Sequence, residues 1–286
     1  MNEINKRQSD ENGRQLRYSF VCWYNRAKRV NTIIIFISFI IAIFSVINIL
    51  FKFKLNDYIA FLGAFWIFIC IVLKNMVNNY KKTGADIQEV FDTYIFDLEK
   101  NSLIGMPQMC EESIYSYSNK NQQNIEELYY AGLESANMIK NIIIAQRDSI
   151  VYDKNMRKAY YIGNIIALII YLFISFALGI IYGLKIEEFL ASIIIPAINI
   201  VVYFTDNIIM IKSELEILRE CELSIKPLFD DVDNGKSGIN ESICRKYQDF
   251  IYMKRRNWVM IPNYIYKIKQ KYKKTRINVN KQLSSN

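Results

Sequence analysis

The chain has 286 residues, of which 52% are hydrophobic, and its formal net charge is +8. It contains no histidine, which excludes Ser-His-Asp and Cys-His catalysis and the usual histidine-containing zinc sites. The apolar residues are bunched into long blocks, so we expect an all-α integral membrane protein with sizeable aqueous parts.

Residues 1–29 precede the first apolar block, which runs from Val30 to Phe51 without a charged residue. About 20 apolar residues cross a bilayer core, and this block is too long for a cleaved signal peptide. A second block begins at Tyr58 and continues past Lys74, whose long side chain can reach the headgroups. Residues 30–77 therefore predict a transmembrane hairpin.

Residues 78–158 predict a helical insert. Apolar residues recur three and four positions apart from Ile87 to Leu98, which is typical of one face of a helix. Gly and Pro in Leu103–Cys110 predict a break, and the pattern over Ile125–Ile143 predicts a second helix that continues through Arg147.

Residues 159–211 predict a second hairpin, with spans over Ala159–Leu184 and Phe189–Ile211. Only a short turn joins them, as in the first hairpin. The expected architecture is two transmembrane helical hairpins, four spans in all, with the insert between them.

After the last span, residues 212–272 predict a helical region, and the polar residues 273–286 predict a disordered tail. Asp230–Gly235 with Glu241 nearly fits a calcium loop, but Val232 stands where a third oxygen ligand is required. We therefore favour a solvated turn there and predict no metal site and no cofactor.

Lysine and arginine are concentrated on one side of the four spans. The two hairpin turns carry few of them, whereas the other span ends carry many: Arg26, Lys28 and Arg29; Lys74, Lys81 and Lys82; Arg157 and Lys158; and Lys212. The positive-inside rule then places both termini and the middle insert in the cytoplasm.

The fourth span carries Asp206, the one ionisable group well inside a span, with Asn199 and Asn207 in the same region. A carboxylate at the bilayer centre costs about 2.5–3.5 kcal/mol. One interpretation is that Asp206 reaches headgroup water or pairs with Lys212. The functional hypothesis is that Asn199, Asp206 and Asn207 line a pore or gate.

Short stretches spread in order over nearly the whole chain carry a family resemblance. They are Asn2-Glu3-Ile4, Tyr24 to Lys28, Ile87 to Phe96, Ala145 to Arg147, Tyr152-Asp153, Gln248-Asp249, Arg255-Arg256 and Ile261-Pro262. With four spans at this spacing, the sequence resembles the bacterial S-4TM pore-forming effectors that are associated with nucleotide-synthase anti-phage systems.

The resemblance implies an effector of the bacterial inner membrane rather than an enzyme. It would stay inactive until infection produces a cyclic nucleotide second messenger. Its subunits would then assemble as a homo-oligomer or open, permeabilise the lipid bilayer and stop growth of the infected cell. Neither DNA nor RNA is an expected partner.

Phosphates of such a ligand could be bound by cations of the insert and tail. The candidates are Arg147, Arg157, Lys158, Arg255 and Arg256, with Tyr152 or Trp258 available for base stacking. The alternative is that these cations contact lipid or pair with carboxylates. At the level of function, the alternative is a membrane sensor or scaffold without a pore, whose insert recruits a soluble partner. A transporter is less favoured, because the spans contain one acid and no matched broken helices.

Overall fold

The computed structural model describes residues 2–51, 55–101, 128–234, 240–268 and 272–285, together with Phe53, Ile104 and Met109. Every regular element in these ranges is a helix, and none is a strand. The expected all-α class is therefore confirmed. The chain divides into two compact units, each described by itself. The polar unit is Met1–Arg26, Tyr80–Arg157 and Glu214–Asn286, and the membrane unit is Ala27–Asn79 and Lys158–Ser213.

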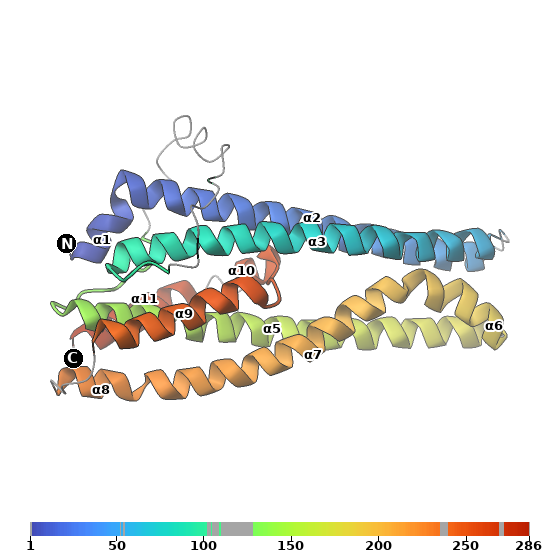
Figure 1. Cartoon of the computed structure of the whole chain (residues 1–286). Coiled ribbons are helices and arrows are strands. Elements are labelled where there is room, and N and C mark those ends of the chain that lie inside the picture. The colour runs from blue at the N-terminus through green and yellow to red at the C-terminus, as the bar shows by residue number, and fades with distance from the viewer. Residues whose placement is uncertain are drawn as a thin grey trace. The chain divides into compact units, whose positions relative to one another are not determined.

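Four long helices contribute residues to both units (Figure 1). They are α2 (Glu11–Phe51), α3 (Asn56–Phe96), α5 (Met138–Ile181) and α7 (Ile195–Ile225). The described residues contain four helical stretches long and apolar enough to cross a membrane, and these cover nearly all of the four predicted spans. The prediction of four spans is confirmed.

Turns in the membrane unit are closed by polar groups. Between α2 and α3, the Asn48 side-chain oxygen accepts the Leu55 amide at 3.1 Å. The second hairpin turns at Gly183, which has a φ of +58°, and then enters α6 (Ile186–Phe189) and the π-helix η2 (Leu190–Ile194). Each hairpin therefore ends in a turn with its own local bonds.

The membrane unit carries many of its large apolar side chains on the outside. The exposed aromatic rings among them include those of Phe36, Phe61, Phe68 and Phe173. Its buried residues include serine and asparagine, such as Ser45, Asn48 and Asn164. Lipid is as apolar as these outer side chains, so an apolar exterior is the expected arrangement for a membrane protein.

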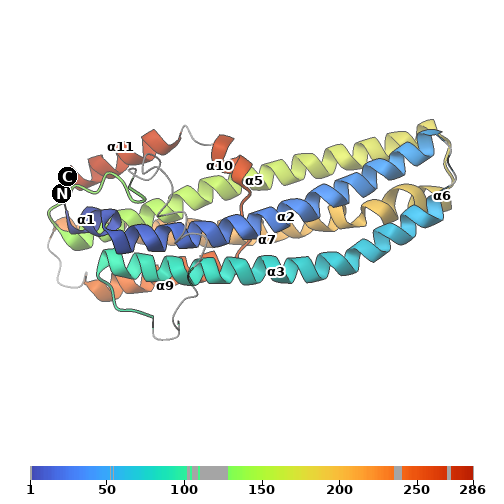
Figure 2. The same ribbon diagram turned by 90° about the horizontal axis from the view of Figure 1, so that it is seen from above.

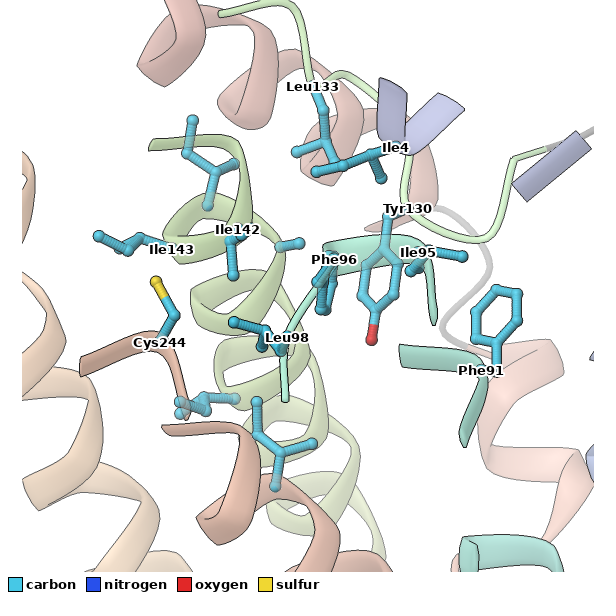
Figure 3. Packing of buried hydrophobic residues seen from close by; sticks show 14 of the residues in the cluster. Ile4, Phe91, Ile95, Phe96, Leu98, Tyr130, Leu133, Ile142, Ile143 and Cys244 are labelled. Carbon is cyan, nitrogen blue, oxygen red and sulfur yellow. The ribbon is translucent and has the colours of Figure 1, made fainter. Parts of the chain in front are cut away.

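In the residues that the structure describes, the polar unit adds five shorter helices to the polar parts of the long ones. They are α1 (Glu3–Ser9), α8 (Pro227–Asp233), α9 (Glu241–Asn257), α10 (Asn263–Ile268) and α11 (Tyr272–Ser285). Within this unit α9 lies along the polar part of α3 (Figure 2). Asn2 and Ser284, near the two ends of the chain, bond to the neighbouring carbonyls of Leu133 and Gly132. Its core gathers side chains from α1, α3, α5, α9 and the segment 128–135, among other elements (Figure 3). They include Ile4, Phe91, Phe96, Tyr130, Leu133 and Ile142.

The predicted second helix of the insert starts later than expected. Residues 128–137 are irregular and α5 begins at Met138, while residues 125–127 and most of Leu103–Cys110 lie outside the described residues. The Asn137 side chain caps the helix by accepting the Ile139 amide at 2.9 Å. The apolar spacing extends over residues 128–137, but the chain is not helical there. Gly132 has a φ of +79°, which a helix does not allow, and the Asn137 cap starts the helix at Met138.

The predicted disorder of residues 273–286 is wrong for the part that the structure describes, because α11 covers it. Polar side chains bind backbone groups of the segment 128–135. Asn280 donates to the Ala131 carbonyl at 3.0 Å, and Ser284 donates to the Gly132 carbonyl at 3.1 Å. Upstream, Asp230 lies in helix α8 rather than in a solvated turn; residues 235–239 are not described.

Candidate functional site

A buried ion cluster lies in the polar unit, formed by Lys81, Asp153, Arg157, Glu214 and Lys254. Arg157 of α5 donates to Asp153 at 2.9 Å and also pairs with Glu214 of α7. Lys254 of α9 lies 3.2 Å from the same Asp153 oxygen. Burial lowers the pKa of Lys254, although Asp153 opposes that effect.

The end of α9 closes this ion cluster with backbone groups. Lys81 of α3 donates to the carbonyl oxygen of Trp258 at 3.0 Å, and Glu214 accepts the amide of Val259 at 2.7 Å. The Arg157 guanidinium lies over the Trp258 ring, 5.1 Å from its centre. The cluster therefore joins the polar parts of α3, α5 and α7 to α9.

Arg255 belongs to a second buried network. It pairs with Asp92 of α3 and donates to the Tyr130 hydroxyl at 3.2 Å. Gln248 donates to Asp92 at 2.9 Å and to Glu89 at 2.7 Å. Burial opposes the charge of Arg255, but Asp92 and the neighbouring tyrosines together outweigh burial and raise the pKa of Arg255. The guanidinium is thus occupied by a carboxylate within the polar unit.

Two further candidates also have partners in the polar unit. Arg256 pairs with Asp86. The Tyr152 ring is covered by the Arg276 guanidinium, whose carbon lies 3.9 Å from the ring centre, and Arg276 also donates to Asp148 at 2.8 Å. A base could stack on that face of Tyr152 only by displacing Arg276.

Arg147 and Lys158 differ from the other candidates. Among the residues that the structure describes, neither has an ion pair or hydrogen bond of its side chain. Arg147 is half-buried on α5 in the polar unit, and Lys158 is exposed in the membrane unit. Arg147 is therefore the candidate in the polar unit whose guanidinium is available to a ligand without breaking an ion pair.

Asn207 takes part in a buried hydrogen-bonded network inside the membrane unit. It donates to the Tyr160 hydroxyl at 3.2 Å and to the Asn164 side-chain oxygen at 3.4 Å. The Tyr160 hydroxyl in turn shares a hydrogen bond of 2.6 Å with that of Tyr203. These groups connect α5 and α7 through their polar atoms.

Asn199 and Asp206 do not join that network. The Asn199 side-chain nitrogen is buried without a hydrogen-bond partner among the described residues. It borders a small cavity, with room for about one water molecule, that is also lined by Ser38, Lys74 and Tyr203. Asp206 is exposed on the surface of α7. The structure therefore brings Asn207 to an interior network, Asn199 to a cavity and Asp206 to the outer face.

Comparison with known proteins decides the family. The family model described as the SMODS-associating 4TM effector domain matches residues 2–282. The chain belongs to this family. It is 29% identical over 277 residues to a protein of Bacillus cereus (strain VD146) named probable CBASS effector molecule, and the match covers 93% of this chain and 92% of that relative. No solved structure matches significantly.

In this 4TM effector, sequence reasoning missed the carboxylates that neutralise the candidate cations. Glu89 and Asp92 are both buried beside Phe91 and Ile95, on the helix that the apolar pattern had identified. Acids next to an apolar stripe were the available signal for buried ion pairs. Among the described residues, no group of three or more metal-binding side chains occurs.

Proposed function

We propose that this chain is a membrane-permeabilising effector of a bacterial anti-phage system, held closed until a cyclic nucleotide signal opens it. The observation that carries the proposal is the polar interior of the membrane unit, where Tyr160, Asn164 and Asn207 are hydrogen-bonded to one another. Polar groups inside membrane spans are unfavourable and usually serve a path for ions or solutes. Their mutual bonds would keep that path closed at rest.

A nucleotide trigger is supported by the family and by the named relative, a probable CBASS effector molecule, because CBASS association implies nucleotide second-messenger signalling in general. Reversing a closed-to-open ratio from 99:1 requires about 5.5 kcal/mol of differential binding. Charge-assisted bonds to phosphates contribute about 1.5–3 kcal/mol each. We place Arg147 first among the contacts, because a ligand there displaces no existing carboxylate.

The proposal includes a homo-oligomer in the bacterial inner membrane, with both termini and the insert in the cytoplasm, and no enzymatic activity. Reporter fusions after Leu55 and after Ile186 test the orientation. A reporter that works only in the cytoplasm should be inactive at both positions, and a reporter that works only outside the cytoplasm should be active at both. The opposite pattern at either position would contradict it.

The decisive experiment is dye release from vesicles that contain the purified full chain, with and without added cyclic di- and trinucleotides. Wild-type protein should release much more dye with one of these nucleotides than without it. Arg147→Ala should abolish that response, whereas Arg219→Ala, which removes an exposed arginine of α7 in the same unit, should not. Nucleotide binding without dye release would favour the sensor or scaffold instead.

A further inference from the structure

A proline interrupts the hydrogen-bond ladder of α7 inside the membrane unit. In an α-helix the amide of residue 196 would donate to the carbonyl of Ser192, but Pro196 carries no amide hydrogen. The helix just before it is the π-helix η2, and the Ile195 amide bonds back five residues to Leu190. Figure 1 shows the ribbon changing direction between α6 and the body of α7.

The carbonyl that Pro196 leaves without its helical donor has another partner. The hydroxyl of Ser45 on α2 donates to the Ser192 carbonyl oxygen, and both residues are almost fully buried. The Tyr171 hydroxyl of α5 donates to the next carbonyl, that of Ile193, at 3.4 Å. Two neighbouring helices thus supply side-chain donors where the ladder of α7 is broken.

The bend also packs closely against α3. Gly63 faces Pro196, and a Cβ atom added at Gly63 would lie 2.9 Å from the Pro196 Cα atom. A side chain of any size there would push α3 and α7 apart. The bend is therefore fitted to all three neighbouring helices of the membrane unit.

We propose that η2 and Pro196 form the hinge at which α7 changes shape when the effector opens, and that the Ser45 hydroxyl holds this hinge in its closed form. The inference rests on the proposed permeabilising function. Sharp bends and π-helical turns are places where a helix can change its hydrogen-bond register. Within lipid a freed carbonyl needs a donor, so the Ser45 bond favours the one geometry in which it forms.

The two residues must then act together. Without the Ser45 hydroxyl the Ser192 carbonyl loses its donor, and the closed form loses one buried hydrogen bond. If Pro196 is replaced by Ala, residue 196 regains an amide that can donate to Ser192, and the Ser45 hydroxyl becomes dispensable.

The test is a double-mutant cycle measured as dye release without added nucleotide, from vesicles of phosphatidylethanolamine and phosphatidylglycerol that contain the full chain. Ser45→Ala should raise basal release roughly three- to tenfold, as expected for one buried hydrogen bond. In the Pro196→Ala background the same change should alter release by no more than about twofold. Thr32→Ala is the control, because among the described residues that hydroxyl donates to the Lys28 carbonyl of its own helix and to no other helix.

Equal increases in both backgrounds would overturn the hinge, since Ser45 would then act somewhere other than on the carbonyl that Pro196 frees. No increase in either background would overturn it as well. Failure of the proposed function is seen separately. In that case dye does not enter infected cells that make the wild-type protein, and no cyclic nucleotide releases dye from vesicles that contain it.

Discussion

The guanidinium carbon of Arg157 lies 5.1 Å from the centre of the Trp258 ring, while the same guanidinium pairs with Asp153 and Glu214. One side chain thus joins α5 to α7 and to the end of α9. Its removal would affect all three contacts at once.

Arg157→Ala should lower the free energy of unfolding by about 3–5 kcal/mol, because it leaves two buried carboxylates with too few cations. Urea unfolding of the detergent-solubilised chain, followed by tryptophan fluorescence, measures the change. The neighbouring Lys158→Ala removes an exposed cation and should stay within about 0.5 kcal/mol. Similar losses for both variants would show that the ion cluster does not stabilise the fold.

Alkaline pH should destabilise the polar unit. Burial raises the pKa of the Cys244 thiol to about 12, and burial also raises the pKa of Tyr129 and Tyr130. Because these folded-state values exceed the unfolded ones, the stability from the neutral groups is complete below pH 9 and declines as the pH rises toward 12. Tyrosinate absorbance should therefore increase together with the loss of helical circular dichroism. Ionisation of the buried tyrosines before unfolding would contradict this.

Gly63→Ala should disturb the closed membrane unit, because the added methyl group would meet the Pro196 Cα atom. Overpacking of this kind costs about 1–3 kcal/mol, so basal dye release should rise severalfold. Gly163→Ala is the matched control, since a Cβ atom at Gly163 has no other atom within 4 Å. Equal release from the two variants would mean that contact with Pro196 is unimportant for closure.

Gly132→Ala should detach α11 from the segment 128–135. Gly132 has a φ of +79°, and a Cβ atom there would lie 2.7 Å from the Ile277 carbonyl oxygen. Faster hydrogen exchange and proteolysis of α11 would report the detachment. Gly183→Ala separates crowding from backbone strain, because Gly183 also has a positive φ, +58°, but open space around it. That variant should leave α11 as protected as in the wild type.

The membrane architecture was predictable from sequence because the spans are defined by local composition. Val30 to Phe51 contains no charge, and lipid selects for such a stretch directly. The helix around Ile87 and Phe91 was predictable for a similar reason, since its apolar spacing is contained in a dozen residues.

The partners of the candidate cations were not predictable in the same way. Arg255 meets Asp92 from 163 positions away, and nothing local in the sequence identifies that pair. Helix α11 was missed because composition alone indicates that its polar residues are solvated. In the structure, Asn280 and Ser284 donate to backbone carbonyls instead. The donor that Ser45 of α2 supplies to the bend at Pro196 was not predictable either, because it comes from a distant part of the chain.

The anchoring of α11 has a practical consequence for anyone who handles this protein. Residues near both ends of the chain contact the same segment, since Asn2 donates to the Leu133 carbonyl at 2.7 Å and Ser284 donates to the Gly132 carbonyl. An affinity tag fused without a spacer after Ser285, or a deletion of the last dozen residues, would therefore weaken the packing of α11 on the segment 128–135. Activity lost on such a preparation should be compared with that of a chain tagged within a hairpin turn.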